Sequence, residues 1–215
     1  MIVSLEGAPA TGKTTTAHHL VEKHGAVRIA EVNELHPRRP SPEPRDWYWQ
    51  RQLDRWRDAV GRRDRLVVLD GDVLQAVWYT WARPEHGFPH WSEALDFFES
   101  QEPGAGLPDL HVHLQIDVEE RRRRERGREH ARGHDRERAE AKVQRHEGLR
   151  SPLRSVFTAL GEAFPCWVLH LTADDLERNA EVIVKQEPAR PDGRAVLSFL
   201  RSWLDEHDPA SHADP

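Results

Sequence analysis

Apolar residues along this chain fall into two patterns that alternate with one another. Short apolar runs, continuous or alternating, lie at residues 2–6, 27–32, 66–70, 110–116 and 166–171. Longer segments with apolar residues every three or four positions lie at residues 13–24, 46–61, 92–100, 153–164, 174–186 and 192–206. The first pattern is typical of buried strands and the second of amphipathic helices. Their alternation predicts an α/β fold built on a five-stranded parallel sheet.

Two stretches interrupt this alternation and predict loops. Residues 36–45 hold four prolines and form either a plain connector or part of a substrate-binding rim, because neither a helix nor a central strand accommodates them. Residues 82–108 are rich in proline and glycine around one short helix. A chain of 215 residues suits one well-buried domain. We therefore expect a single three-layer domain over residues 1–206 and a disordered tail over residues 207–215.

Composition narrows the class of protein. Charged residues make up 32% of the chain and the net charge is −6, which argues against bulk binding to nucleic acid. No run approaches the roughly 18 apolar residues of a membrane span, and the amino terminus leads directly into a predicted strand, so we expect a cytoplasmic protein. Cys166 is the single cysteine, and its apolar neighbours predict a buried packing residue.

The most informative motif lies between the first strand and the first helix. Residues 7–14, Gly-Ala-Pro-Ala-Thr-Gly-Lys-Thr, fit the pattern G-x-x-x-x-G-K-[ST]. A loop of this length, closed by glycine at both ends, can turn its backbone N–H groups around a phosphate chain. Lys13 then places a charge on the β- and γ-phosphates, and the Thr14 hydroxyl is available to Mg²⁺. We expect the nucleotide to contact Gly7, Ala10, Thr11, Gly12, Lys13, Thr14 and Thr15.

Acidic residues stand at the carboxyl ends of two predicted strands, where open α/β sheets bind their ligands. Glu31 lies near the end of the second strand, and we expect it to act as a base toward an acceptor hydroxyl. Asp70 ends the third strand and is the candidate for Mg²⁺, acting through water. Asp72 is the reserve for that role, although it also fits the N-cap of a following helix.

Candidate acceptor-binding residues follow these strands. The helix at 46–61 has an apolar face that predicts core packing and a polar face that offers Gln52 and Arg55 to a substrate. The aromatic cluster around Trp78 fits either a core or a pocket for a flat acceptor. His111 and His113 on the fourth strand lack a third metal ligand at a suitable spacing, so we expect packed or solvated side chains. The acceptor candidates are Glu31, Trp49, Gln52, Arg55, Asp70, Trp78 and Arg83.

An arginine-rich segment follows the fourth strand over residues 118–146. Such a charge run is usually a solvated helix, and contact with nucleic acid is an alternative. Beside a phosphate loop we favour a lid whose arginines close over the transferred phosphoryl group. Gly127 and Gly133 would let the lid open and close. We expect Arg124 and Arg128 to act in catalysis and Arg126 to bind the nucleotide.

These residues together resemble the P-loop small-molecule kinases, most closely the thymidylate-kinase and deoxynucleoside-kinase branch. Leu5-Glu6-Gly7 before Gly12-Lys13-Thr14-Thr15 is similar to the opening of thymidylate kinases, and the run from Leu114 to Asp135-Arg136 is similar to their lid. Glu31 matches the position of the general base in deoxynucleoside kinases, and Gln52 with Arg55 resembles their acceptor-binding helix. The resemblance implies the strand order 2-3-1-4-5.

Gly71 departs from this resemblance, because those families place an arginine after the acidic residue that Asp70 matches. A phosphate or hydroxyl clamp would then have to come from Arg51, Arg55 or Arg83. Chloramphenicol-type phosphotransferases share the scaffold and phosphorylate an antibiotic hydroxyl, so a specialised acceptor is a serious competitor.

The function that we predict is transfer of the γ-phosphoryl group of ATP, with Mg²⁺, to a small-molecule acceptor. The acceptor group is a nucleoside- or nucleotide-like hydroxyl or phosphate, and the first alternative is an antibiotic hydroxyl. A second alternative is an NTPase switch that acts with nucleic acid, against which no glutamate follows Asp70 to polarise water. The sequence leaves open whether the protein forms a homodimer.

Overall fold

The computed structural model describes residues 1–84 and 88–207, and its centre is one parallel sheet. The strand order is β2-β3-β1-β4-β5, so both the predicted fold class and the order implied by the resemblance are confirmed. The strands are β1 (Ile2–Glu6), β2 (Val27–Ile29), β3 (Val67–Asp70), β4 (Leu110–Gln115) and β5 (Val168–Thr172).

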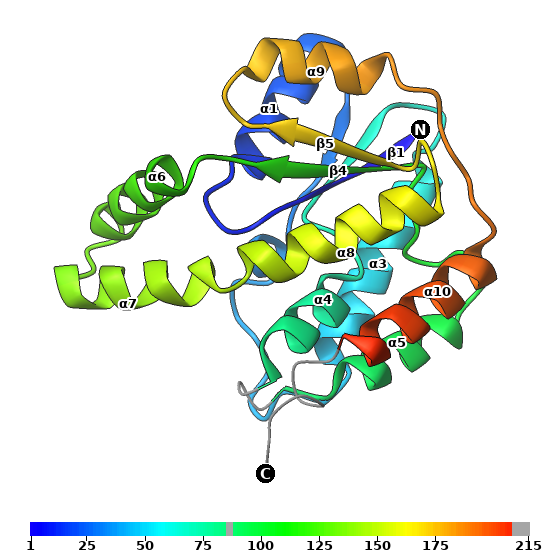
Figure 1. Ribbon diagram of the computed structural model, residues 1–215, viewed down its shortest axis with the longest axis horizontal. Coiled ribbons are helices and arrows are strands. Elements are labelled where there is room, and N and C mark those ends of the chain that lie inside the picture. Colours follow the sequence, from blue (N-terminus) through cyan, green and yellow to red (C-terminus); the bar gives the residue numbers. More distant parts are fainter. Residues whose placement is uncertain (85–87, 208–215) are drawn as a thin grey trace.

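Helices cover both faces of the sheet and make three layers (Figure 1). On one face lie α1 (Lys13–His24) and α9 (Leu176–Val184). On the other face lie α3 (Trp47–Gly61), α4 (Gln75–Ala82), α5 (Trp91–Glu99), α8 (Arg150–Ala163) and α10 (Gly193–Glu206). The two faces are called the α1 face and the α8 face below.

The central strands β1 and β3 are mostly apolar because the sheet is buried on both faces there. Along β1, Ile2 packs into the core of the α8 face, whereas Val3 and Leu5 pack into the core of the α1 face. Along β3, Leu69 packs into the core of the α8 face and Val68 packs into the core of the α1 face. Side chains alternate between faces along a strand, so the side chain of each polar residue at a strand end can be assigned to one face.

Two helices, α6 (Val118–Ala131) and α7 (Arg136–Glu147), form a hairpin that projects from the body of the molecule. Asp117 caps α6 by accepting from the backbone N–H groups of Glu119 and Glu120, and Asp135 caps α7 in the same manner. The hairpin spans the segment predicted to be a lid and is called the lid below. In the described parts of the chain, no helix is both long and apolar enough to cross a membrane.

Three local predictions differ from the structure or lie outside it. The second strand ends at Ile29 instead of Val32, because Glu31 is the N-cap of a short helix, α2 (Val32–Leu35). Cys166 is exposed, with φ of 67° in the turn before β5, so the prediction of a buried packing residue was wrong. Of the predicted tail, residues 208–215 lie outside the described residues.

Candidate active site

The loop between β1 and α1 has a backbone that requires glycine at its first position. Gly7 has φ of 149°, and a Cβ atom there would lie 2.4 Å from the backbone oxygen of Leu114. Ala10 and Gly12 also have positive φ, 68° and 102°, and Gly12 occupies the N-cap of α1 without a side-chain cap. These conformations leave the first N–H groups of α1 free to bind an anion, which is the geometry predicted from the motif.

The functional side chains of this loop lie at its helical end. Lys13 is almost fully buried, and its Nζ donates to the carbonyl oxygen of Gly7 at 2.7 Å, which draws the ammonium group across the loop. Thr14 and Thr15 are exposed in the first turn of α1, whereas Thr11 is buried. The positive end of the α1 dipole adds to the Lys13 charge. Contact of these residues with a nucleotide stays a prediction.

Glu6 is a buried carboxyl at the base of the loop that sequence reasoning did not single out. Its Oε1 accepts from the backbone N–H of Gly7 at 2.7 Å, and Lys13 and Asp72 are close enough to affect its charge. Burial is the largest influence and raises the pKa of Glu6 from 4.5 to about 7. The only signal in the sequence was an acid between an apolar strand and Gly7.

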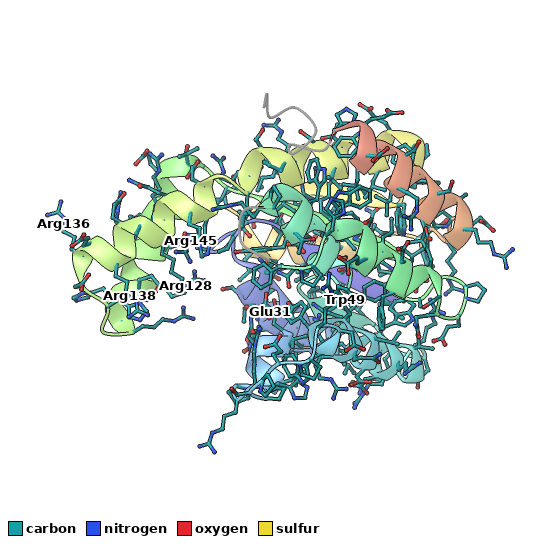
Figure 2. The ribbon with its side chains drawn as sticks, turned by 90° about the horizontal axis from the view of Figure 1, so that it is seen from below. Glu31, Trp49, Arg128, Arg136, Arg138 and Arg145 are labelled. Carbon is teal, nitrogen blue, oxygen red and sulfur yellow. The ribbon has the colours of Figure 1, made fainter. Side chains whose placement is uncertain are left out.

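Glu31 reaches the end of the sheet from the N-cap of α2 and lies against Gly71 (Figure 2). A Cβ atom on Gly71, which has φ of 87°, would lie 3.0 Å from Oε1 of Glu31. A side chain at position 71 would therefore be strained by this φ and would require the end of Glu31 to shift by a few tenths of an ångström. Within the described residues, no hydrogen bond or ion pair engages the Glu31 side chain, so it can accept a proton or hydrogen bond from a ligand.

Asp70 and Asp72 lie on opposite faces of the sheet. Asp70, on the α1 face, accepts from Nε and Nη2 of Arg28 through Oδ2 at 3.0 and 2.7 Å. Its buried Oδ1 has no partner in the part of the chain that the structure describes. Both oxygens of Asp72 are engaged on the α8 face, by Ser4, His111, the N–H of Leu74 and Trp78. Burial alone would raise the pKa of Asp72, but His111 and Ser4 hold it below its ordinary value. Asp70 lies on the face of the sheet that α1, the helix of Thr14, also covers, so these two residues are the candidates for a Mg²⁺ site. Both oxygens of Asp72 are already engaged, so Asp72 is not a candidate.

Most of the predicted acceptor residues form structure instead of an open surface. Arg55 is 2% exposed, and its guanidinium donates to the backbone oxygens of Ala30, Asp70 and Gly71, so it joins the ends of β2 and β3. Gln52 accepts from Arg55, and its buried Nε2 has no partner among residues 1–84 and 88–207. The structure therefore gives Arg55 a supporting role and does not present it as a substrate clamp.

The aromatic and arginine candidates are also engaged. Trp78 is 1% exposed, and its indole N–H donates to Asp72, so its place is in the core. Trp49 is 8% exposed and packs against Phe97. Arg83, at the end of α4, donates to the backbone oxygen of Arg145 in the lid. Both tryptophans belong to the core of the α8 face, which was one of the two predictions for the aromatic cluster, and Arg83 contacts the lid.

The predicted lid arginines differ in where they lie. Arg124 extends over the phosphate loop, since its Nη1 is 3.6 Å from the position of a Cβ on Gly12. Arg128 lies one helical turn further on and donates to Glu125 at 2.9 Å. Arg126 is exposed and donates to Glu140 at 2.9 Å, away from the loop. The placement supports a phosphate role for Arg124 and not the predicted nucleotide contact of Arg126.

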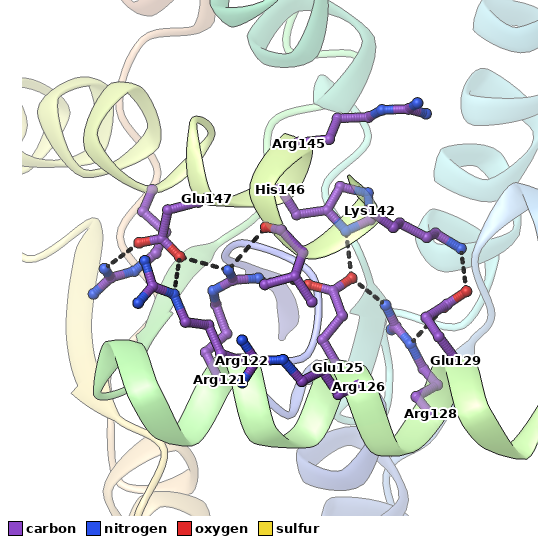
Figure 3. Close-up of polar contacts among 12 residues, drawn as sticks. Arg121, Arg122, Glu125, Arg126, Arg128, Glu129, Lys142, Arg145, His146 and Glu147 are labelled. Carbon is purple, nitrogen blue, oxygen red and sulfur yellow. Dashed lines mark hydrogen bonds and ion pairs between the residues drawn. The ribbon is translucent and has the colours of Figure 1, made fainter. Parts of the chain in front are cut away.

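Two buried carboxylates hold the lid together (Figure 3). Glu125 is bonded to Arg121, Arg128 and His146. Glu129 is bonded to Arg132, His134 and Lys142, and although burial alone would raise its pKa, Lys142 and His134 hold it at about 2. Gly127 lies inside α6 and Gly133, with φ of 77°, lies in the turn before α7, so only the second fits a point of flexibility.

The two histidines of β4 are packed. The sequence had predicted that they are either packed or solvated. His111 lies between Asp72 and Trp167. His113 stacks on Phe157 and its Nδ1 lies 3.2 Å from that of His170, and burial lowers the pKa of His113 to about 3. His113 also lines a cavity of about 230 Å³ between the phosphate loop and the start of α8. No cluster of three metal-ligating side chains occurs among the residues that the structure describes.

Comparison with known proteins adds a family and a set of solved structures. A family model described as an AAA domain matches residues 2–153. A search of curated proteins found no match. Three solved structures of deoxyadenosine kinase from M. mycoides each cover 86% of this chain and 97% of their own. The complex with dATP is 15% identical with a TM-score of 0.54, the complex with dCTP is 14% identical with a TM-score of 0.54, and the complex with the products dCMP and dCDP is 15% identical with a TM-score of 0.57. At this level of identity the likeness confirms the kinase fold expected from the sequence.

Proposed function

The chain belongs to the AAA-domain family that matches residues 2–153 and has the P-loop kinase fold, and from that premise we propose that it transfers the γ-phosphoryl group of ATP to a hydroxyl of a small, nucleoside-like acceptor. The family and the fold are the general support for phosphoryl transfer. The identity of the donor and the class of acceptor belong to the proposal. The acceptors named for the similar structures are properties of those proteins and serve here only to choose the first compounds to test.

The observation that carries the proposal is the position of Glu31. Its carboxylate stands at the same end of the sheet as the phosphate loop, lies against Gly71, and has no partner within the described residues. The buried guanidinium of Arg55 is near enough to interact with its charge. An acceptor hydroxyl needs a group that accepts its proton, and Glu31 can take this role. An ATPase could use the same carboxylate to orient water, so the test below compares transfer to acceptors with hydrolysis.

Each residue of the site has a separate role in the proposed reaction. The acceptor hydroxyl donates a hydrogen bond to Glu31 and attacks the γ-phosphorus in line with the bond to the leaving ADP oxygen. Its proton passes to Glu31 as the new P–O bond forms. Lys13 exchanges its bond to the Gly7 oxygen for the phosphates, and Arg124 neutralises charge from the lid side.

Thr14 and Asp70 would hold Mg²⁺, which supplies charge neutralisation between the β- and γ-phosphates when bound. Support for this assignment comes from the unpaired Oδ1 of Asp70 and the exposed position of Thr14. Arg28 keeps the other Asp70 oxygen occupied at 2.7 Å and so fixes the orientation of the carboxylate.

The test is consumption of ATP with Mg²⁺ against nucleosides, deoxynucleosides, their monophosphates and hydroxyl-bearing antibiotics, with product masses read directly. We expect one class of acceptor to gain a single phosphoryl group and the Lys13→Ala variant to lose this transfer while it keeps the fold. Slow hydrolysis that no acceptor changes, but that RNA or DNA stimulates, would replace the proposal with an ATPase. Undiminished transfer by Lys13→Ala would contradict the assignment of the loop.

A further inference from the structure

Three exposed arginines of α7, Arg136, Arg138 and Arg145, have no ion pair among the described residues. Arg138 and Arg145 are exposed, and among the described residues neither side chain has an ion pair or hydrogen bond. Seven residues separate them, which places them on the same side of the helix about 10 Å apart. Lys142 lies between them on that side and is bonded to Glu129 at 3.0 Å. We call Arg128, Arg138, Lys142 and Arg145 the inner edge of the lid.

This inner edge faces the body of the molecule. Arg128 is one turn beyond Arg124, whose guanidinium lies over Gly12 of the phosphate loop. The backbone oxygen of Arg145 accepts from Arg83 at the end of α4, so this part of α7 lies next to the body. Figure 2 shows Arg128, Arg138 and Arg145 on the side of the lid toward Glu31.

The opposite edge of the lid carries an exposed ion pair and one exposed arginine that has no ion pair among the described residues. Arg126 and Glu140 form an exposed ion pair there, at 2.9 Å. Arg136 lies two residues before Arg138, which turns it about 200° around α7, and Figure 2 shows it directed away from the body. The inner edge is thus a distinct, positively charged side of the lid, at which two guanidinium groups are available to a ligand.

We infer that the acceptor carries a phosphate group of its own, and that Arg138 and Arg145 bind it from the lid while Glu31 meets the reacting hydroxyl. The inference rests on the proposed phosphoryl transfer and names its substrate class: a small phosphorylated alcohol such as a nucleoside monophosphate. Arginine suits this role because its fork of N–H donors matches phosphate oxygens. A neutral acceptor would leave the two charges unused.

The acceptor is a better match for these arginines than the nucleotide donor. The donor phosphates belong to the loop, which Arg124 already covers from α6. Arg138 and Arg145 lie on α7, which touches the body at Arg83 and continues toward α8, on the face of the sheet that α3 and α4 share. The net charge of −6 favours a small phosphorylated ligand over a polynucleotide at this edge.

The experiment compares matched acceptors and matched variants. Nucleosides, their 5′- and 3′-monophosphates and a short oligonucleotide are offered with Mg²⁺ and ATP to the wild type, Arg138→Gln, Arg145→Gln and the control Arg136→Gln. We expect one monophosphate to have a kcat/KM at least about ten-fold above that of its nucleoside. Arg138→Gln and Arg145→Gln should each raise its KM about 10- to 100-fold, because each loses hydrogen bonds to a charged group. Arg136→Gln should change that KM less than about two-fold, and the KM for ATP should stay unchanged in all three.

Several outcomes would overturn the inference without touching the proposed function. Nucleoside and monophosphate could be phosphorylated equally well, or Arg138→Gln and Arg145→Gln could raise the KM for ATP instead of that for the acceptor. Preference for the oligonucleotide over every mononucleotide would replace the small acceptor with a nucleic-acid end. Transfer to no compound at all would instead be a failure of the proposed function. Arg138→Lys and Arg145→Lys should recover part of the lost affinity, which a merely structural role would not predict.

Discussion

The phosphate-loop end of the sheet and the lid both bury carboxylates, but only the sheet surrounds them with an apolar core. Glu6 and Asp70 end β1 and β3, and Asp72 follows β3; apart from Ser4, the other residues of these two strands are buried aliphatic side chains. In the lid, Glu125 and Glu129 are equally buried, yet the buried apolar side chains of α6 and α7 in the described residues are Ala139 and Val143. The sheet end is held by packing together with its polar contacts, whereas the lid depends mainly on ion pairs.

Because of this difference, we expect the sheet end of the site to be rigid and the lid to be mobile. Packing against a core fixes the loop, Glu31 and Asp70 in one geometry, which phosphoryl transfer requires. Ion pairs without a core are exchanged more easily for water, salt or ligand phosphates, so the lid should open at a lower free energy than the sheet unfolds. The same arginines that stabilise the closed hairpin can then also respond to a bound anion.

Removing one buried lid carboxylate should have the largest effect. Glu125→Gln leaves Arg121, Arg128 and His146 without their shared acceptor charge, and the free energy of lid opening should fall by about 3 kcal/mol. Hydrogen exchange of α6 and α7 measures this opening. The exposed pair supplies the control, since Glu140→Gln should cost less than about 1 kcal/mol. Equal losses in the two variants would show that the lid does not depend on its buried charges.

A methyl group added at Gly7 should destabilise the sheet end to nearly the same extent. The new Cβ would lie 2.4 Å from the backbone oxygen of Leu114, which cannot move without displacing β4. We expect Gly7→Ala to lower the free energy of unfolding by about 2–3 kcal/mol and to weaken ATP binding. Denaturant unfolding and nucleotide titration measure the two effects. A variant as stable as the wild type would mean that the loop adapts and is not fixed by packing.

The buried Glu6 carboxyl should make the free energy of unfolding decrease as the pH rises. An ion-paired acid has the opposite effect, because its contribution to stability is lost as the pH falls. Burial raises the pKa of Glu6 in the folded protein from 4.5 to about 7, so the folded state binds its proton more tightly than the unfolded state. Its contribution to stability is greatest below about pH 4.5, decreases up to about pH 7 and then stays lower, by up to about 3 kcal/mol.

Glu6→Gln removes this titration. We expect the variant to gain stability over the wild type between pH 5 and pH 8, as measured by urea unfolding at a series of pH values. A parallel pH dependence of the two proteins would show that Glu6 does not titrate in this range. Glu93→Gln, at an exposed ion pair with Arg45, is a control that leaves the Glu6 contribution in place.

The smallest expected effect has the opposite sign and lies in the lid. Gly127 is inside α6, and a Cβ there would meet no atom within 4 Å. Gly127→Ala should therefore stabilise the lid by about 0.5–1 kcal/mol, through helix propensity alone. Gly133→Ala should destabilise it, since φ is 77° at that turn. Hydrogen exchange of α6 would detect both changes, and a loss of protection in Gly127→Ala would contradict the helical role of that residue.

How far the sequence could predict this site depends on how far apart the interacting residues lie along the chain. The phosphate loop could be predicted because eight consecutive residues carry its geometry, and Glu31 and Asp70 could be placed from the ends of their strands. The Arg28 and Asp70 pair joins residues 42 positions apart, and the Ser4 and Asp72 pair joins residues 68 positions apart. No local pattern reveals such partners.

The errors have a related cause. The periodicity around Arg55 and Trp78 shows which helical face is apolar, but it does not show whether a polar group on that helix meets substrate or backbone oxygens. In the structure Arg55 donates to four backbone carbonyl oxygens at the sheet end, and Trp78 donates to Asp72. Likewise, the arginine run predicted a lid, while the sorting of Arg124, Arg126 and Arg138 onto different sides required the α6–α7 hairpin.

The most direct test of the account is a single-turnover measurement with Glu31→Gln and the acceptor that the mass assay identifies. Glutamine keeps the size of the side chain beside Gly71 but cannot accept the proton of the hydroxyl. We expect the rate of phosphoryl transfer to fall about 10²- to 10⁴-fold, while the Kd for ATP with Mg²⁺ changes less than about two-fold. Equal losses in rate and in ATP affinity, or a transfer rate that does not change, would contradict the assignment of Glu31 as the base.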